Sequence, residues 1–354
     1  MPRRVSSYVL PIVVAAALAF FSPGVPAQTS APAGPEIELP AWAFPVPPNR
    51  AGGAAAGPAA AGRAGGAARG RSAAPPDTTL LSVPNSTRQY TAAQTRNSFD
   101  IADWHPDEHA PMPDVVSHGR RPDVQACGYC HLANGFGKPE NAPLAGQPVD
   151  YLVQQMHDFR DGTRTGSESR IVGPSQMKRI ASAATEEEIR TAAEYFAGIK
   201  RKPWIRVIEA DEAPLVYNAG VMYRVVEGQG AGVQPLGNRI VEVAENYEAT
   251  ALRDGGSGFI AYVPTGAVAR GKALASTGGG RTLVCSTCHG PDMRGIGSIP
   301  SIAGRSPSYM ARQLYDFKTG ARHGAMAPLM TAVVAKLSAE DFVDLLAYLA
   351  TLAP

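Results

Sequence analysis

All four cysteines of the 354-residue chain lie in two Cys-x-x-Cys pairs, and a histidine follows each pair directly. The first unit reads CGYCH at residues 127–131, and the second reads CSTCH at residues 285–289. Each unit gathers two thiols and one imidazole within five residues. A group held by all three side chains would constrain how the chain folds around each unit.

The two units lie inside a longer repeat. A constant offset of 158 residues superimposes them and continues without a gap through the segment that follows. It pairs Gly137 with Gly295, Tyr151 with Tyr309, Gln155 with Gln313, and Arg164 with Arg322; after a five-residue shift it pairs Met177 with Met330, Thr185 with Ser338, and Tyr195 with Tyr348. The chain therefore contains a duplicated module.

Both copies of the module are predicted to be helical. Residues 150–162 and 308–320 carry apolar side chains at helical spacing and end in glycine, which favours a C-terminal cap. Residues 184–199 and 336–352 open with capping-box patterns, Thr185 with Glu188 and Ser338 with Asp341. A further helix is expected over residues 265–277, at the start of the second copy.

The segments outside the modules differ from them in amino-acid composition and pattern. Residues 220–226, 238–245 and 258–263 are β-branched and aromatic runs bounded by Gly and Asn, which indicate short strands. Residues 28–78 are mostly Ala, Gly and Pro and show no periodic apolar face. We predict a mainly α chain with a disordered tether (28–78), a first domain (79–203), a strand-bearing connector (204–265) and a second domain (266–354).

The first 27 residues resemble a secretory signal peptide. Arg3 and Arg4 precede an apolar run of 13 residues from Val9 to Phe21, and small residues lead to a cleavage site at Ala27. A membrane-spanning helix needs about 20 apolar residues, so we expect cleavage and a soluble, exported protein rather than a retained anchor. Without the two arginines the chain has 31 basic and 31 acidic residues, which does not indicate nucleic-acid binding.

Three chemistries use a Cys-x-x-Cys pair. A thiol–disulfide exchanger needs the pair beside a βαβ unit, and no such pattern surrounds either pair. A zinc ribbon needs two pairs separated by about 15 to 20 residues, whereas 154 residues separate Cys130 from Cys285. Covalent attachment of a c-type haem requires the histidine that follows each pair, and we predict this use.

The predicted chemistry assigns a role to every residue of the two units. Two thiols add to the two vinyl groups of one porphyrin, and the adjacent imidazole binds the iron. The predicted haem-attachment residues are Cys127 and Cys130 in the first unit and Cys285 and Cys288 in the second, with His131 and His289 as iron ligands. We therefore expect two covalently bound haem c groups.

These residues resemble the class I cytochrome c family, and their duplication resembles its two-haem c-four type. The pattern of a glycine-rich stretch after the histidine, an Ala-Gly pair, a helix with Tyr, Gln and Asp-Phe, a methionine, and an acid-capped last helix recurs in residues 112–202 and 266–354. This resemblance covers about half of the chain. It implies two tandem class I cytochrome c domains, and it leaves the tether and the connector without a role.

The resemblance also implies further site residues. A methionine would bind the second face of each iron: Met177 in the first domain and Met330 in the second, with Met326 as an alternative to Met330. The carbonyl of Pro300 would fix His289, while either Ala142 or Pro143 would fix His131. Tyr151, Tyr309, Arg164 and Arg322 would bind haem propionates or serve ordinary helix packing.

Iron closed by histidine and methionine has no position for a substrate, so we expect an electron carrier rather than an enzyme. The expected location is the periplasm, and the expected partners are a dehydrogenase-type donor and an oxidase or other acceptor. Two alternatives remain: a peroxidase or thiosulfate-oxidising enzyme with one open or non-Met iron, and the cytochrome subunit of a larger complex associated with a membrane respiratory chain. The other histidines, His105, His109, His118, His157 and His323, are expected to be surface or structural residues.

Overall fold

The computed structural model describes residues 37–46, 77–220 and 222–354. The predicted signal peptide and most of the predicted tether lie outside the described residues. The described residues from Leu39 onward form one unit of mutually contacting elements. Within the described part, no helix is both long enough and apolar enough to cross a bilayer.

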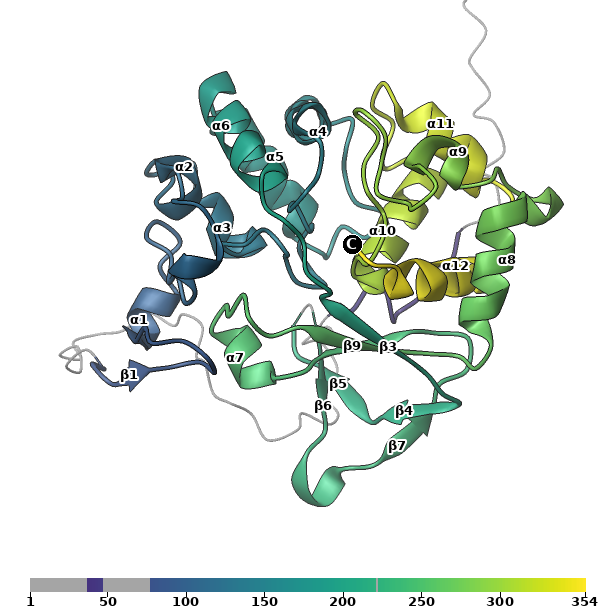
Figure 1. The fold of residues 1–354 in the computed structure, drawn as a ribbon, viewed down its shortest axis with the longest axis horizontal. Helices are drawn as coiled ribbons and strands as arrows, with labels where there is room; N and C mark the ends of the chain where they lie inside the picture. Colours follow the sequence, from purple (N-terminus) through teal and green to yellow (C-terminus); the bar gives the residue numbers. More distant parts are fainter. Residues whose placement is uncertain (1–36, 47–76, 221) are drawn as a thin grey trace, which may run out of the picture. The chain divides into compact units, whose positions relative to one another are not determined.

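The first helical group surrounds the CGYCH unit (Figure 1). It comprises α2 (Asp114–Ser117), α3 (Cys127–His131), α4 (Val149–Asp161), α5 (Gly173–Ala183) and α6 (Glu186–Ala197). Val116, Leu152, Ile180 and Phe196 form its buried core. The predicted caps are confirmed: α6 begins with a Thr185–Glu188 capping box, and α4 ends at Gly162 in the left-handed conformation (φ 76°).

The second helical group surrounds the CSTCH unit. It comprises α8 (Ala267–Thr277), the short 3₁₀ turn η3 (Gly278–Gly280), α9 (Ser286–His289), α10 (Pro307–Lys318), α11 (Ala327–Val334) and α12 (Ala339–Thr351). Helices α4 and α10 begin 158 residues apart, and α6 and α12 begin 153 apart, as the alignment predicts. Helix α12 begins with the predicted Ser338–Asp341 capping box.

Helices α8 and α12 approach each other closely at Gly271. A Cβ at this position would collide with the backbone carbonyl of Asp344 and would lie 3.0 Å from the Cβ of Tyr348. Only a residue without a side chain allows this backbone-to-backbone packing. The predicted helix over residues 265–277 is thus confirmed as α8, and its glycine sets the distance to α12.

The connector folds as a sheet with the strand order β3-β9-β8-β6-β5. Its strands are β3 (Ile205–Glu209), β5 (Val216–Asn218), β6 (Tyr223–Val225), β8 (Val241–Ala244) and β9 (Phe259–Val263); β4 (Glu212–Pro214) pairs separately with β7 (Val233–Pro235), and the 3₁₀ turn η2 (Gly228–Gly230) and helix α7 (Tyr247–Ala251) lie in the same segment. Each of the three predicted runs contains a strand: β6, β8 and β9. Alternate residues of β9 are buried, and α12 packs on β3 and β9 (Figure 1).

Residues before the first unit pack against the connector. They contain β1 (Leu80–Leu81), β2 (Tyr90–Thr91), α1 (Ala92–Thr95) and the 3₁₀ turn η1 (Pro106–Glu108). Trp104 is buried with Val83 and Ala249 of α7, and its ring lies edge-on to Tyr90 at 4.8 Å between centroids. The Trp104 indole Nε1 donates to the Leu252 carbonyl at 2.9 Å. Residues 79–110 and α7 therefore share one small core.

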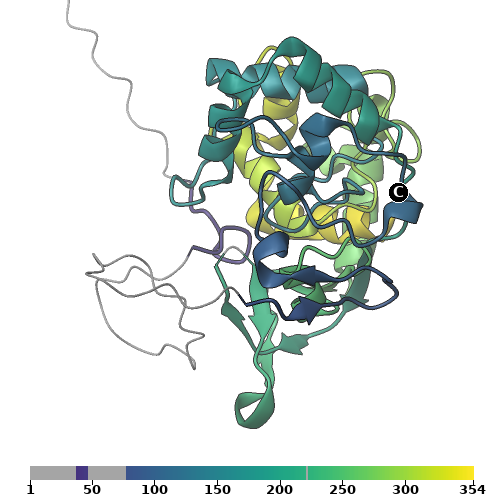
Figure 2. The same cartoon turned by 90° about the vertical axis from the view of Figure 1, so that its left-hand side faces the viewer.

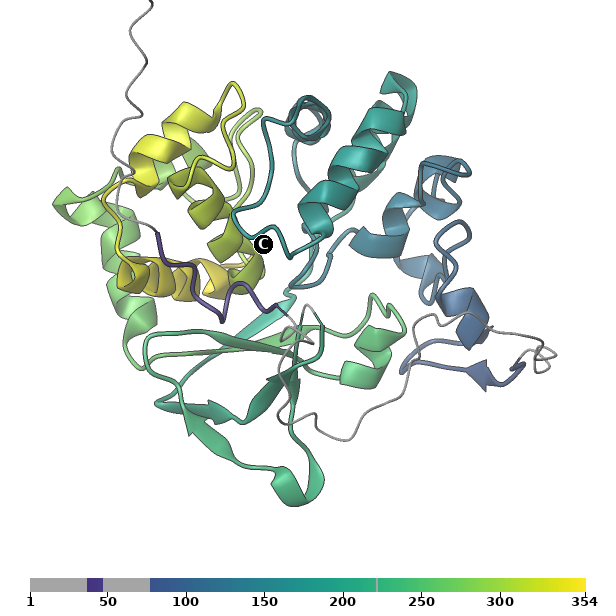
Figure 3. The ribbon, with the colours of Figure 1, turned by 180° about the vertical axis from the view of Figure 1, so that it is seen from behind.

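One part of the predicted tether is packed rather than free, which corrects that prediction for residues 39–46. Trp42, Ala43 and Phe44 are buried, and the Phe44 ring meets Tyr315 of α10 edge-on at 5.8 Å. The Ala43 carbonyl accepts from Arg312 Nη1 at 2.8 Å, and the Ala41 carbonyl accepts from the Tyr223 hydroxyl at 2.9 Å. Figures 2 and 3 show this purple segment beside the yellow C-terminal helices. Trp42 and Phe44 supply the apolar area that the surrounding Ala, Gly and Pro lack.

Candidate haem sites

The first unit forms the single turn of helix α3. His131 is 8% exposed, and its ring Nδ1 lies 2.8 Å from the Ala142 carbonyl oxygen. A carbonyl partner requires a proton on Nδ1, which leaves the Nε2 lone pair for a metal. Of the two carbonyls that the sequence left open, Ala142 is the one used. Burial also lowers the pKa of His131, which favours the neutral imidazole that binds metals.

The second unit repeats this arrangement. His289 is also 8% exposed, and its Nδ1 lies 2.8 Å from the Pro300 carbonyl, as expected. Cys285 caps α9, so both thiols and the imidazole again lie on one turn. Burial likewise lowers the pKa of His289. The two candidate sites therefore present the same donor set with the same ring orientation.

The thiols of both units are free. Burial raises the pKa of the Cys127 thiol to about 12, and it raises the pKa of Cys130 and Cys285 as well. A thiol–disulfide exchanger needs the opposite shift, because its attacking sulfur must be a thiolate near neutral pH. The environment of the thiols therefore opposes exchange chemistry, and protonated thiols remain available for addition to a vinyl group.

Tight backbone turns place the carbonyls that hold the two histidines. Gly137 N donates to the His131 carbonyl at 3.1 Å, and Gly295 N donates to the His289 carbonyl at 2.8 Å. Both glycines have a positive φ, and a Cβ on Gly295 would collide with the Ile299 carbonyl. The aligned glycines are therefore needed for the loop to return to its histidine.

The two units differ in the residue after the histidine. Gly290 follows His289 with φ 81° and ψ 162°, whereas Leu132 follows His131 with φ 66° and ψ 158°. This region of backbone space is nearly restricted to glycine, and a non-glycine residue there costs about 1–3 kcal/mol. Leu132 is only 1% exposed, so its burial offsets the strain.

The predicted methionine ligands lie in helices. Met177 belongs to α5 and Met330 belongs to α11, while Met326 caps α11 and is 62% exposed. The polar sequence around Met177 predicts a loop, but the structure shows the helix Gly173–Ala183 packed on α4. Pro174 suits its first turn, and Ile180 and Ala181 supply its buried face. These positions leave the choice between Met326 and Met330 a prediction.

The two helical groups meet through paired residues of the repeat. Arg164 donates to the Tyr309 hydroxyl at 3.1 Å and to Gln313 Oε1 at 2.9 Å, and Arg322 donates to Gln155 Oε1 at 2.7 Å. Against the effect of burial, the guanidinium groups of Arg322 and Arg164 lower the pKa of Tyr151. Each group thus inserts its arginine among the tyrosine and glutamine of the other.

A second pair of contacts has the same reciprocal form. Gln147 of the first group exchanges hydrogen bonds with the backbone of Ser301, at 2.9 and 3.1 Å. Arg305, which the 158-residue offset aligns with Gln147, donates to the Pro143 carbonyl at 2.7 Å. Since aligned residues make exchanged contacts, the two groups face each other about an approximate twofold axis.

Two buried arginines, Arg164 and Arg322, lie where the two helical groups meet. Arg164 and Arg322 are 7% and 8% exposed, yet all their side-chain acceptors are neutral. In the described ranges, no carboxylate lies within ion-pair distance of either guanidinium. The buried Asp316 carboxylate acts on both guanidinium groups without forming an ion pair with either. One carboxylate cannot balance two buried positive charges, so a further anionic group suits this position. Haem propionates would supply such carboxylates, and the donor sets of both units therefore fit haem c.

The remaining histidines are engaged elsewhere. His105 Nε2 pairs with Asp254 at 2.7 Å, and His109 Nε2 pairs with Asp103 at 3.1 Å. His118 contacts Asp100, His157 contacts Glu186, and His323 contacts the Gly320 carbonyl. This agrees with the surface or structural roles that we expected. No cluster of metal-binding side chains was found among residues 37–46, 77–220 and 222–354.

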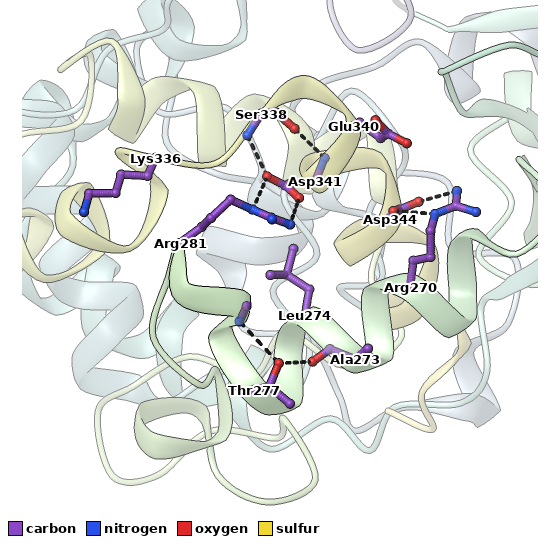
Figure 4. Close-up of a pocket in the computed structure, with 11 residues that line it drawn as sticks. Arg270, Ala273, Leu274, Thr277, Arg281, Lys336, Ser338, Glu340, Asp341 and Asp344 are labelled. Atoms are coloured by element: carbon purple, nitrogen blue, oxygen red, sulfur yellow. Dashed lines mark hydrogen bonds and ion pairs between the residues drawn. The ribbon is translucent and has the colours of Figure 1, made fainter.

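A hollow between α8 and α12 lies apart from these donors (Figure 4). Arg270 pairs with Asp344 at 2.8 Å and Arg281 pairs with Asp341 at 2.7 Å across it. The lining contains no cysteine, histidine or methionine. We read the two ion pairs as support for the packing of α12 on α8.

The proteins that this chain resembles are cytochromes c, which agrees with the thiol and imidazole donors of the two units. The cytochrome c family model matches residues 268–353. A cytochrome c4 of Azotobacter vinelandii is 33% identical over 247 residues, which cover 68% of this chain and 90% of that protein. The chain belongs to the cytochrome c4 family. Membership makes it a dihaem electron-transfer cytochrome with covalently bound haem c.

Two further relatives illustrate the range of the similarity. A cytochrome c4 of Pseudomonas aeruginosa is 26% identical over 227 residues, or 63% of this chain and 82% of that protein. A thiosulfate dehydrogenase electron acceptor of Thiomonas intermedia is 26% identical over 223 residues, or 61% of this chain and 74% of that protein. The fold of this chain is cytochrome c4-like, with helices and a sheet.

Sequence reasoning missed one contact at the first site. Arg253, from the turn after α7, donates to the Tyr129 carbonyl at 2.7 Å, and its Cζ lies 3.6 Å from the centroid of the Tyr129 ring. Tyr129 lies between Cys127 and Cys130, so the connector touches the CGYCH unit itself. No local sequence pattern predicts this contact, because Tyr129 and Arg253 are 124 positions apart in the chain.

Proposed function

We propose that the two units hold the two haems of this cytochrome c4 in tandem domains, residues 79–203 and 266–354. The observation that carries the proposal is the matched geometry of the two histidines, each with Nδ1 2.8 Å from a backbone carbonyl eleven residues further along. Cys127, Cys130, Cys285 and Cys288 form the thioether bonds, and His131 and His289 bind iron through Nε2. The carbonyls fix the tautomer and the ring plane of each ligand.

In both domains a methionine would complete the set of protein ligands that hold the iron. We assign Met177 to the first iron and Met330 to the second, with Met326 as the alternative to Met330. A bound haem supplies one-electron chemistry, and its potential depends on axial ligation, burial and nearby charge. The chain therefore acts as a carrier: its side chains close the iron to substrates and exclude water.

The buried contact between the helical groups holds the two sites in a constant relation. Arg164 and Arg322 provide positive charge for the propionates, and Gln155 and Gln313 orient the guanidinium groups. Tyr151 and Tyr309 complete the hydrogen-bond network. This arrangement suits a protein that passes single electrons between two sites without changing shape.

The carrier operates in the periplasm after removal of residues 1–27. It takes electrons from a dehydrogenase-type donor and passes them to an oxidase or another acceptor, free or as a subunit of a larger complex. The similarity to a thiosulfate dehydrogenase electron acceptor supports a thiosulfate-oxidising donor. Thiosulfate alone should then leave the oxidised protein unreduced, whereas thiosulfate with a thiosulfate dehydrogenase should reduce it. Rapid reduction by thiosulfate alone would favour the alternative, an enzyme with one open iron.

A redox titration with spectra tests the core of this proposal. Protein matured in a host that attaches c-type haem should keep its pigment on a denaturing gel, and its mass should exceed that of the bare chain by two haems. The titration should show two one-electron waves and low-spin spectra in both states. A single haem by mass, or a high-spin signal from one site, would contradict it.

A further inference from the structure

The turn that follows α7, residues 252–256, carries a side chain to the first site only. Arg253 stacks on the Tyr129 ring and bonds to its carbonyl, so the guanidinium lies against the peptide between the two cysteines. In the second unit, the residue aligned with Tyr129 is Thr287, which is exposed.

The conformation of Arg253 is unusual and firmly held. Its φ is +66°, a left-handed value that costs a non-glycine residue about 1–2 kcal/mol. The residues on either side are anchored: the Leu252 carbonyl accepts from Trp104 at 2.9 Å, and the Gly255 carbonyl accepts from Asn134 at 2.7 Å. Such strain persists only where the surrounding structure imposes it, and it is commonly found at functional positions.

The charge of Arg253 is not balanced locally. The nearest acidic neighbour along the chain, Asp254, is paired with His105 at 2.7 Å, and Glu140 near Cys130 is paired with Lys138 at 2.6 Å. Arg253 itself forms no ion pair with any residue in the described ranges. A net positive charge therefore faces the first attachment unit. It is half-buried, so solvent screens it less than it would screen a surface charge.

We propose that Arg253 raises the reduction potential of the haem at the first site and so sets the order in which the two haems are reduced. Reduction adds one negative charge to a haem, and a cation held nearby stabilises the reduced state more than the oxidised state. The sheet-bearing connector is thus the element that makes two sites with the same donors electrically unequal. The inference rests on the haem attachment proposed for Cys127 and Cys130.

Replacing Arg253 by glutamine in the full-length dihaem protein tests this role. In R253Q, one of the two potentials should fall, corresponding to a several-fold smaller equilibrium constant for reduction; a tenfold change equals about 59 mV for one electron. The other potential should stay where it is. R253K should keep the parent potentials, because it retains the charge and can retain the contact with the Tyr129 ring.

Arg224 provides the matched control. It comes from the same connector, and its Cζ lies 4.2 Å from the centroid of the Tyr247 ring, but it pairs with Glu248 at 2.8 Å and does not touch the CGYCH unit. R224Q should leave both potentials unchanged. If R253Q does not mature with two haems, T287R places a cation at the aligned exposed position, and it should raise the potential of the second haem.

The outcomes separate this inference from the proposed function. Unchanged potentials in R253Q, an equal fall in R253K, or an unresponsive T287R would overturn the role of Arg253 and leave the dihaem assignment intact. Parent protein without haem at the first unit would instead refute the attachment at Cys127 and Cys130. Mass spectrometry before each titration distinguishes the two failures.

Discussion

Arg164 and Arg322, which are 158 residues apart in the chain, face each other as an isolated antiparallel bridge between the two helical groups. Thr165 N donates to the Ala321 carbonyl and His323 N donates to the Thr163 carbonyl, both at 2.8 Å. The side chains continue this exchange through Gln155 and Gln313. A duplicated sequence thus makes its internal contact with two copies of one surface, as subunits of a symmetric dimer do.

This contact should contribute measurably to stability. Arg164→Gln removes buried hydrogen bonds to Tyr309 and Gln313, and we expect a loss of about 1–3 kcal/mol in the free energy of unfolding. A double-mutant cycle with Tyr309→Phe, measured by denaturant unfolding of the dihaem protein, should give a coupling energy of about 0.5–3 kcal/mol. Arg206→Gln breaks an exposed ion pair with Glu245 and serves as the control, with an expected change below about 1 kcal/mol. Zero coupling between Arg164 and Tyr309 would show that the contact is incidental.

Axial ligation can be tested one methionine at a time. Met177→Ala and Met330→Ala should each remove about half of the near-red absorption band of the oxidised protein and lower one of the two potentials, because thioether ligation raises the potential. Met326→Ala changes the residue that caps α11 and is the matched control. It should keep the band. Loss of the band in Met326→Ala with retention in Met330→Ala would reverse the assignment for the second domain.

Leu132 allows backbone strain to be measured at the first site. Both Leu132→Ala and Leu132→Gly lose the buried side chain, at a cost of about 2–5 kcal/mol. Glycine also relieves strain of about 1–3 kcal/mol, which exceeds its usual entropic disadvantage of about 0.5–1 kcal/mol. Thermal or denaturant unfolding should therefore rank the parent above L132G, and L132G above L132A. The reverse order of the two variants would mean that position 132 is not strained.

His109 should make stability depend on pH. Its hydrogen bond to Asp103 is the main cause of a raised pKa, which burial opposes. A raised pKa in the folded state means that the protonated form stabilises the protein; this contribution is complete below the unfolded value of about 6.5 and is lost as pH rises through the folded value. The free energy of unfolding of the parent should exceed that of H109Q by more at about pH 5.5 than at about pH 8.5.

The matched control for this experiment is H118Q. His118 lies 3.3 Å from Asp100, but both side chains are more than half exposed, so solvent screens the pair. Its removal should change stability little at either pH. His109 Nδ1 also lies 3.1 Å from the Tyr195 hydroxyl. A difference in stability between the parent and H109Q that is the same at both pH values would indicate that His109 contributes through this contact rather than through its charge.

Features that depend on near neighbours were predicted from the sequence. The Cys-x-x-Cys-His units, the caps of α6 and α12, the glycine end of α4 and the strands β6, β8 and β9 follow from residues within a few positions of one another. The repeat also predicted where the helices of the second copy begin. Local propensity and periodicity determine such elements because their hydrogen bonds close within one or two turns.

Other features required the folded chain. The parallel pairing of β3 with β9 joins strands about fifty residues apart, and the burial of Trp42 and Phe44 depends on a surface made by α10 and the sheet. The helix at Met177 also differs from the predicted loop, because its apolar face becomes evident only when α4 is beside it. Short segments of mixed composition are decided by such partners rather than by their own preferences.

The amino-acid sequence alone determined which reactive groups this protein carries: two Cys-x-x-Cys-His units and the repeat that contains them. Only the tertiary structure decided the surroundings of each unit, from the Ala142 carbonyl at His131 to the guanidinium of Arg253 at Tyr129. Covalent reactivity depends on the types of the side chains and on their spacing, and both can be read from the sequence. The electric field at a site is a sum over charges that folding brings together across more than a hundred residues, and no local pattern contains that sum.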